Sequence, residues 1–258
     1  MLSFNSEKCK HLHIGRNEPD NLLLDGHQLH RVHEEKDLGV TFEDTLSFHK
    51  HISAKINQAN KMFGIIRRTF RHLDQATFLP LYKGMVRSHL DFSASVYSPH
   101  HKMDIDRIEA VQRRATKQLP GLRNLTHPER LKKLKLPTLA YRRQRADMIE
   151  LYKATSGLYE EGLCKFIRLR AQATDRQGHR HNNKGIFPTH SRTNMRRNSF
   201  GNRTAIVWNS LPNHVVNAPS LDSFKNRLDK LWLTQPLLYE YTEAIDPRMY
   251  RQETPQEA

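Results

Sequence analysis

Cysteines, long apolar runs and secretion signals are scarce in this 258-residue sequence. Two cysteines, Cys9 and Cys164, lie far apart, which argues against a disulfide framework and is typical of a reducing compartment. No run approaches the roughly 18 apolar residues of a membrane span, and the N-terminus lacks the basic-then-apolar layout of a signal peptide. We therefore expect an intracellular protein of the nucleus or cytoplasm, neither secreted nor inserted in a membrane.

Motifs of common catalytic and metal sites are also missing. The sequence contains no Gly-x-Ser-x-Gly elbow, and none of its eleven glycines has the spacing of a phosphate-binding loop. Histidines do occur in pairs, but a structural zinc site needs four ligands, usually with paired cysteines. We interpret the pairs as surface residues and predict no metal site. The pairs are His11 with His13, His49 with His51, and His179 with His181.

Acidic residues are outnumbered by basic ones. The sequence has 42 Lys and Arg against 27 Asp and Glu, a formal net charge of +15. Such an excess favours a polyanionic partner, of which nucleic acid is the most general.

The first 45 residues alternate in hydrophobicity with a period of two, as strands do. Residues 21–24 and 29–32 flank Asp25-Gly26, a pair that favours the positive φ angles of a tight hairpin turn. Residues 37–42 (Asp-Leu-Gly-Val-Thr-Phe) are predicted to form a third short strand or its edge. So few short strands cannot stand alone, so we expect them to lean on helices.

From His49 onward the apolar period changes to 3.6, which predicts a long amphipathic helix that ends near Phe70. Asp74 is a predicted N-cap for a second helix whose apolar side includes Met85. Thr126 and Glu129 have the spacing of a capping box, and residues 138–156 form a further predicted helix that Gly157 ends.

Residues 104–119 are predicted to form the helix that combines packing with charge. One side carries an apolar stripe and the others are rich in cations, with Asp104 and Asp106 in the first turn where they suit the helix dipole. Similar basic clusters occur at the end of the first long helix and in the helix at 138–156. The candidate anion-binding cations are Arg67, Arg68, Arg107, Arg113, Arg114, Lys117, Arg142, Arg143 and Arg145.

The C-terminal third is more varied. Residues 167–198 hold eight Lys or Arg and a single acid, Asp175, and are predicted to form a mobile basic loop. Apolar spacing then predicts helices from Phe200 to Leu211 and from a Ser220 cap to Leu231. The tail from Thr234 is acid-rich and is predicted to be disordered.

These elements together predict an α+β fold that is mostly α, with a small N-terminal β segment followed by a helical bundle. The predicted units are residues 1–45 (β segment), 46–166 (helical domain), 167–198 (basic flexible loop), 199–233 (C-terminal helices) and 234–258 (tail).

Seven short segments follow one another in the order found in one known family. They are Phe4-Asn5-x-x-Lys8-Cys9, Asp37-Leu38-Gly39-Val40, Leu81-Tyr82-Lys83-x-Met85-Val86-Arg87, Glu109-Ala110-Val111-Gln112-Arg113-Arg114-Ala115-Thr116, Arg130-Leu131-x-x-Leu134, Leu139-Ala140-Tyr141-Arg142-Arg143 and Trp208-Asn209-x-Leu211-Pro212. From about Leu2 to Leu231 the sequence resembles the C-terminal part of a non-LTR (LINE-type, jockey-like) retrotransposon reverse transcriptase. The sequence departs from the family's pattern at Ser88, where proline is usual, and at Tyr97, where tryptophan is usual.

The resemblance implies roles for particular residues. Lys8 matches the lysine of polymerase motif D, near the phosphates of the incoming nucleotide, and Leu38 and Gly39 match the turn of the primer grip. By the same resemblance residues 1–45 are the edge of a polymerase palm, and the helices that follow are a thumb with its C-terminal extension. Arg113, Arg114, Arg142 and Arg143 match basic helix positions that hold the template and primer duplex.

Polymerase chemistry needs carboxylates that hold two metal ions, and the family supplies them from an early aspartate and an Asp-Asp pair. The sequence contains no Asp-Asp pair, so it holds no cofactor of its own and magnesium would belong to a palm that is not present. We expect a truncated, non-catalytic fragment of an RNA-directed DNA polymerase that binds RNA–DNA hybrid or duplex backbones. The predicted site therefore has no catalytic residue.

Two alternatives remain open. The helices after His49 could instead form a protein-interaction module, for which an exposed apolar stripe would be the evidence. The chain could also be the C-terminal half of an active reverse transcriptase that a gene model has split, with the remaining palm and fingers as its partner.

Overall fold

The computed structural model describes Asn5, residues 8–15, 21–70 and 72–160, Ile167, Leu169 and residues 182–252, the side chains of the last two residues excepted. Several expectations lie outside these residues. They concern Phe4 of the first motif, Cys164, His179, His181, most of the basic loop from residue 168 to 181, and residues 253–258 of the tail.

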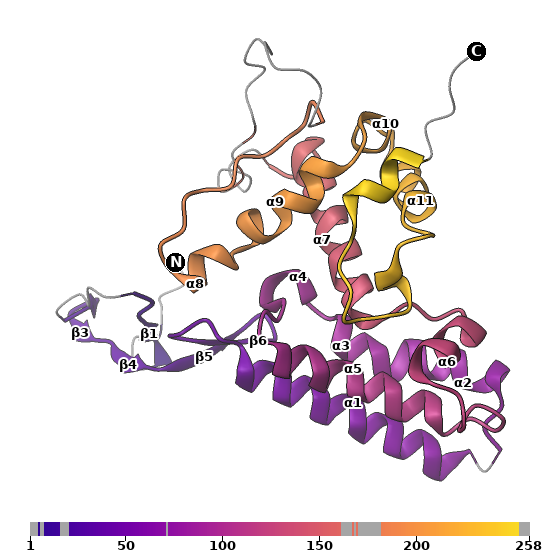
Figure 1. Ribbon diagram of the computed structural model, residues 1–258. Helices are drawn as coiled ribbons and strands as arrows, with labels where there is room; N and C mark the ends of the chain where they lie inside the picture. The colour runs from indigo at the N-terminus through magenta and orange to yellow at the C-terminus, as the bar shows by residue number, and fades with distance from the viewer. Residues whose placement is uncertain are drawn as a thin grey trace.

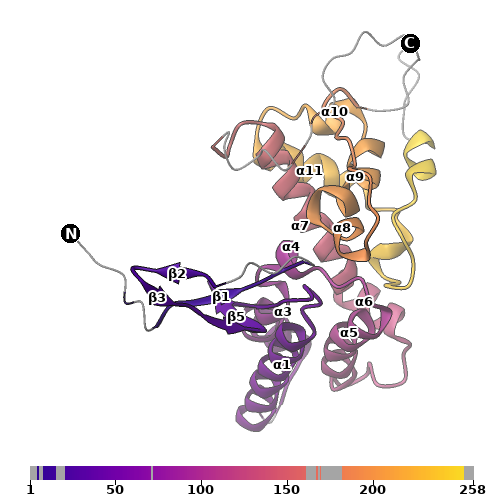
Figure 2. The same cartoon turned by 90° about the vertical axis from the view of Figure 1, so that its left-hand side faces the viewer.

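Within the described residues, the strands pair as three two-stranded ribbons that project from one side of the helices (Figures 1 and 2). Asp25 and Gly26 make the predicted tight turn with φ of 50° and 79°. Residues 37–42 are not one strand, because Leu38 and Gly39 (φ 45° and 83°) reverse the chain there into a second hairpin. The bounds are β1 Lys10–Leu12, β2 Leu23–Leu24, β3 His27–Gln28, β4 His30–Val32, β5 Glu34–Asp37 and β6 Val40–Glu43; β1 pairs with β4 in parallel, and β2–β3 and β5–β6 are antiparallel.

The long predicted helix is confirmed as α1 (His49–Thr69). Its apolar stripe is buried along its whole length, from Ile52 to Ile66, mainly against α5 and the segment between α1 and α5. An exposed stripe on this helix, which would have favoured an interaction module, is therefore not found.

The second predicted helix begins as expected but does not continue as one α-helix. Asp74 caps it by accepting a hydrogen bond from the Thr77 backbone N–H at 2.8 Å. Beyond Pro80 the helix widens into a π-helical segment, which changes the angular phase of the residues that follow. Met85, predicted on the buried side, is 37% exposed, whereas Val86 is buried. The bounds are α2 Gln75–Leu81, η2 Tyr82–Arg87, α3 Ser88–Asp91 and α4 Ala94–Tyr97.

The basic helix is α5 (Lys102–Lys117), and α6 (His127–Leu134) follows it across a short loop. The capping box at the start of α6 is confirmed, since Glu129 accepts both the Thr126 N–H and the Thr126 hydroxyl at 2.7 Å. Helices α1 to α6 enclose a first hydrophobic core that ends at Leu139.

Helix α7 (Leu139–Thr155) joins this core to a second one (Figure 1). Its N-cap, Thr138, accepts the Tyr141 N–H at 3.0 Å while its own hydroxyl donates to the Leu237 carbonyl at 2.6 Å. The Thr138 N–H donates to the Leu238 carbonyl at 2.9 Å. The two hydrophobic cores therefore divide near residue 140, at the start of α7.

The second core packs α7 against the C-terminal helices around Trp208, Phe224 and Trp232. We expected residues 234–258 to be disordered, but residues 234–250 pack into this core. Leu237, Ile245 and Tyr250 are buried in it, and Trp232 Nε1 donates to the Tyr250 hydroxyl at 2.9 Å. The bounds are α8 Asn194–Arg197, α9 Phe200–Ser210, α10 Asn213–Val216, α11 Leu221–Leu231, η4 Pro236–Leu238 and η5 Pro247–Gln252.

The fold is therefore α+β and mostly α, as the sequence predicts, with small two-stranded ribbons beside a helical body in two cores. None of the helices in the described part of the chain is both long and apolar enough to cross a membrane.

Candidate nucleic-acid interface

Helix α5 separates its polar residues into two kinds. Glu109, Gln112 and Thr116 are buried with the apolar stripe, where they hydrogen-bond to neighbouring elements. Arg113 and Arg114 alternate with them around the helix and are exposed. The Glu-Ala-Val-Gln-Arg-Arg-Ala-Thr motif thus combines residues that hold the helix in place with residues that face outward.

The outward cations of α5 line a groove of about 450 Å³ at its C-terminal end. The wall opposite α5 is the loop to α6 and the first turns of α6 itself. Five of the eight described lining residues are cations, and none of the eight is Asp or Glu. The lining residues are Arg113, Arg114, Lys117, Arg123, Asn124, Leu125, Thr126 and Arg130.

Arg130 is the unusual member of this groove because it is only 3% exposed. Its Nε donates to the Thr116 hydroxyl at 3.2 Å and its Nη1 to the Leu125 carbonyl, and neither acceptor carries a charge. Burial, and then the like charge of Arg113, lower the pKa of Arg130 from its ordinary value. A guanidinium remains protonated in proteins, so this buried charge favours an anion in the groove.

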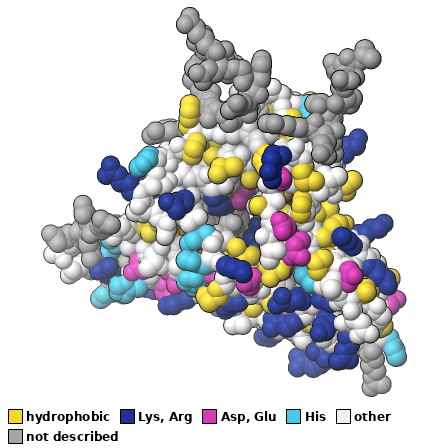
Figure 3. Space-filling view, in the orientation of Figure 1, with side chains coloured by type: hydrophobic (Ala, Val, Ile, Leu, Met, Phe, Trp, Pro, Cys, Tyr) yellow, Lys and Arg dark blue, Asp and Glu magenta, His cyan; other side chains and the backbone are white. Residues whose placement is uncertain are grey.

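Helices α1 and α5 run parallel, which extends the basic surface beyond the groove. Ser53 accepts a hydrogen bond from Arg107 at 2.8 Å, and Asn60 accepts one from Arg114 at 3.1 Å. Both contacts join residues 54 positions apart, so the two helices run in the same direction side by side. Phe63 is therefore level with Lys117 at the end of α5, and Arg67 and Arg68, exposed in the last turn of α1, lie about one helical turn beyond that end. Lys and Arg side chains gather over the C-terminal halves of these two helices, at the lower right of Figure 3.

Acidic groups near the groove are few and are engaged. Residues 111–135 contain eight Lys or Arg and one acid, Glu129. Glu129 is held by the capping box, and its hydrogen bonds with Thr126 lower its pKa. Asp106 faces Tyr241 together with Arg113, and the pKa of Tyr241 is raised first by burial and then by Asp106.

The other predicted cation of α5, Arg107, lies at the far end of the helix. Its Nη1 donates to Asp104 at 3.1 Å and its Nη2 to Ser53. Arg107 thus links α5 to α1 and stands apart from the groove.

The predicted basic cluster of α7 is directed inward. Arg142 makes a bidentate pair with Asp91 (2.9 and 2.7 Å), and Arg145 makes another with Asp229. Arg143 is 5% exposed, and burial lowers its pKa. Arg142 thus joins α7 to α3 and Arg145 joins α7 to α11, so the cluster does not present an open basic face.

The residues assigned to motif D and the primer grip lie on the β ribbons, away from the groove. Lys8 is exposed, and Leu38 is 90% exposed at the tip of the β5–β6 turn. Gly39 needs its positive φ and also lies close under Phe92, where a Cβ would be 3.1 Å from the ring. Lys55 lies 4.2 Å from the centre of the same ring, so Phe92 fixes the hairpin tip against α1.

Two groove residues, Arg123 and Arg130, are absent from the sequence-based set. Periodicity could not find them, because Arg123 lies in a loop and Arg130 is on the buried side of α6. The available signal is composition, since residues 111–135 hold eight Lys or Arg and a single acid.

The donor set for magnesium is not brought together either. Within the residues that the structure describes, no three His, Cys, Asp or Glu side chains gather as ligands for a metal ion. The residues present do not fit such an ion, and no step proposed for this chain passes through one.

The chain matches no protein-family model, no curated protein and no solved structure.

Proposed function

We propose that the protein binds nucleic acid through the groove between α5 and α6, with the sugar-phosphate backbone as the ligand. The observation that carries the proposal is a groove whose described lining holds five cations and no Asp or Glu, and in which the hydrogen bonds of the buried Arg130 go to uncharged acceptors. Phosphate oxygens would satisfy that guanidinium and neutralise its neighbours. The resemblance to the C-terminal part of a non-LTR retrotransposon reverse transcriptase supports the same ligand class.

The expected mode of binding is sequence-neutral. Cations that contact phosphates release counterions, so affinity falls steeply with salt and depends little on base sequence. We propose an RNA–DNA hybrid as the preferred duplex, which the resemblance alone suggests. The proposal assigns no catalytic step to this chain.

Removal of Arg113 and Arg114 together should weaken the binding of a labelled RNA–DNA hybrid and flatten its salt dependence. Each lost phosphate contact removes roughly one unit of slope, so the double alanine variant should lose about two units. Fluorescence anisotropy over a range of salt concentrations measures this slope.

The matched control removes two positive charges from a different face of the protein. Lys225→Ala with Lys230→Ala on α11 lowers the net charge equally and should leave the slope within experimental error of the wild type. An equal change in both variants would mean that only net charge matters. Unchanged binding after the loss of Arg113 and Arg114 would remove the groove from the interface.

A further inference from the structure

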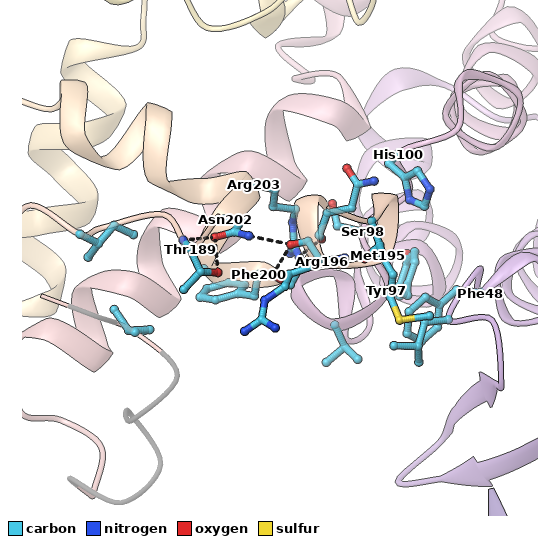
Figure 4. A pocket seen from close by; sticks show the side chains of 18 of the residues that line it. Phe48, Tyr97, Ser98, His100, Thr189, Met195, Arg196, Phe200, Asn202 and Arg203 are labelled. Atoms are coloured by element: carbon cyan, nitrogen blue, oxygen red, sulfur yellow. Dashed lines mark hydrogen bonds between the residues drawn. The ribbon is translucent and has the colours of Figure 1, made fainter. Parts of the chain in front are cut away.

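A second hollow lies between the two cores. It has a volume of about 740 Å³, within the range of ligand sites, and three separate segments form its walls. These are β6 with its connection to α1, the chain around α4, and residues 186–203, and Ile167 is a further lining residue. Figure 4 shows Phe48, Tyr97 and Met195 on one side of this cleft and Thr189 and Phe200 on the other.

The cleft offers apolar and aromatic surface. Phe187 is 53% exposed and Val96 is 49% exposed, both on its lining. Phe42 and Phe48 meet edge to face at 5.7 Å on the opposite wall. Phe48 has a left-handed backbone (φ 57°), which is rare for a bulky residue and indicates that the fold holds this side chain in a fixed place.

The charge of the cleft is positive. Its described lining residues include Arg196 and Arg203 and no Asp or Glu. Arg196 is exposed, and its guanidinium extends into the space between the walls (Figure 4). Arg203 is paired with Asp147 at 3.0 Å.

Behind Arg203, the buried Asp147 lies close to a second arginine, Arg143. The Nη1 of Arg143 is buried without a hydrogen-bond partner. Asp147 therefore faces two arginines, Arg143 and Arg203, while Asp91 already pairs with Arg142. Arg143 also lies near Glu109 and Asp91, so the cation that the cleft itself presents to an anionic occupant is Arg196.

We propose that the cleft receives unpaired nucleotides of the strand whose duplex part lies in the groove at the other end of α5. Aromatic faces beside arginine are the features that proteins use to bind single strands, because every base can stack and every phosphate is an anion. A wholly apolar peptide would bury Arg196 without a partner, which is unfavourable. This inference rests on the function proposed above.

The geometry of α5 connects the two sites. The cleft reaches His100, just before α5 begins, and the groove contains Lys117, where it ends. Sixteen helical residues span about 24 Å, which corresponds to about seven base steps of a duplex. One nucleic acid of ordinary length can therefore reach both sites.

The test compares a blunt RNA–DNA hybrid with the same hybrid carrying a short single-stranded extension, and it includes the extension alone. The extended hybrid should bind the wild-type protein roughly tenfold more tightly than the blunt one, as the stacking of a base or two predicts. Phe187→Ala and Arg196→Ala should each remove most of this gain while the affinity for the blunt hybrid stays unchanged. A fluorescent base analogue in the extension should report stacking with wild-type protein and lose that signal with Phe187→Ala.

Arg197→Ala is the matched control, because Arg197 is an exposed neighbour on the same short helix α8 and does not line the cleft. It should keep the tenfold gain. A gain that is absent in wild type, or lost equally in Arg197→Ala, would overturn the cleft proposal and leave the groove untouched. Binding of the extension alone without any binding of the blunt hybrid would support the cleft and overturn the groove, and binding of no probe would overturn both.

Discussion

Glu109→Ala is expected to destabilise the protein far more than the loss of any exposed charge. The Glu109 carboxylate is fully buried and accepts the Leu139 N–H at 3.0 Å, and it lies 3.3 Å from His127 Nε2 and 3.4 Å from Gln112 Nε2. Removal of one member of such a buried network typically costs about 3 to 5 kcal/mol, since the remaining donors lose their acceptor. We expect the melting temperature to fall by about 10 °C.

Two further variants distinguish the loss of the Glu109 hydrogen bonds from the general effect of replacing a glutamate with alanine. Glu109→Gln keeps an acceptor for Leu139 and should lose about half as much stability. Glu243→Ala makes the same change at an exposed position and should leave the melting temperature within about 1 °C of the wild type. A small effect of Glu109→Ala would mean that α5 and α7 are held together by apolar packing alone.

Acidic pH should lower the free energy of unfolding because the folded protein keeps His51 neutral. The interpretation of this histidine as a surface residue is wrong, because its side chain is 1% exposed and its Nδ1 accepts the Thr41 N–H at 3.2 Å. Burial, followed by the charges of Lys55 and Lys36, lowers its pKa from 6.5 to about 4. The unfolded chain therefore binds the proton more readily, and the stability contributed by neutral His51 is complete above pH 6.5 and is lost as the pH falls toward 4. The loss should reach about 3 kcal/mol, because each pKa unit corresponds to about 1.4 kcal/mol.

A variant that cannot titrate isolates this contribution. The side-chain oxygen of His51→Asn can replace Nδ1 as the acceptor for Thr41, so the variant should fold. Urea unfolding at neutral and at acidic pH measures the free energy of unfolding of both proteins, and the other titrating groups cancel in the comparison. The wild type should lose about 3 kcal/mol more than the variant over this range. Parallel pH profiles would show that the ring of His51 is free to protonate in the folded state.

Local signals in the sequence predicted local structure well. The Asp74 cap, the capping box of Thr126 and Glu129, and the stripe of α1 all depend on residues within a few positions of each other, and all are confirmed. Charge and periodicity also predicted that Arg113 and Arg114 face outward, as they do.

Local signals of this kind do not predict which residues pair across long distances in the sequence. A helical period places Arg142 and Arg145 on particular sides of α7, but their carboxylate partners lie 51 and 84 residues away. The pattern of cations therefore predicted a basic face on α5 and another on α7. Of these two helices, α5 leaves Arg113, Arg114 and Lys117 exposed to a ligand, whereas Arg142 and Arg145 of α7 are paired with carboxylates. The groove itself depends on Arg123 and Arg130, whose positions are set by the path of the loop after α5.

The hydrogen bonds of Thr138 affect the order in which the two halves of the chain can fold. Thr138 stands at the joint between the two cores, yet its acceptors at Leu237 and Leu238 lie about 100 residues further along the chain. During synthesis the first core can assemble from local contacts as soon as α6 has emerged. The joint can close only after the ribosome has completed Leu238, because contacts of such long sequence separation must await both ends. The nascent protein should therefore pass through a stage in which an ordered basic bundle is already exposed while the second half is still being made.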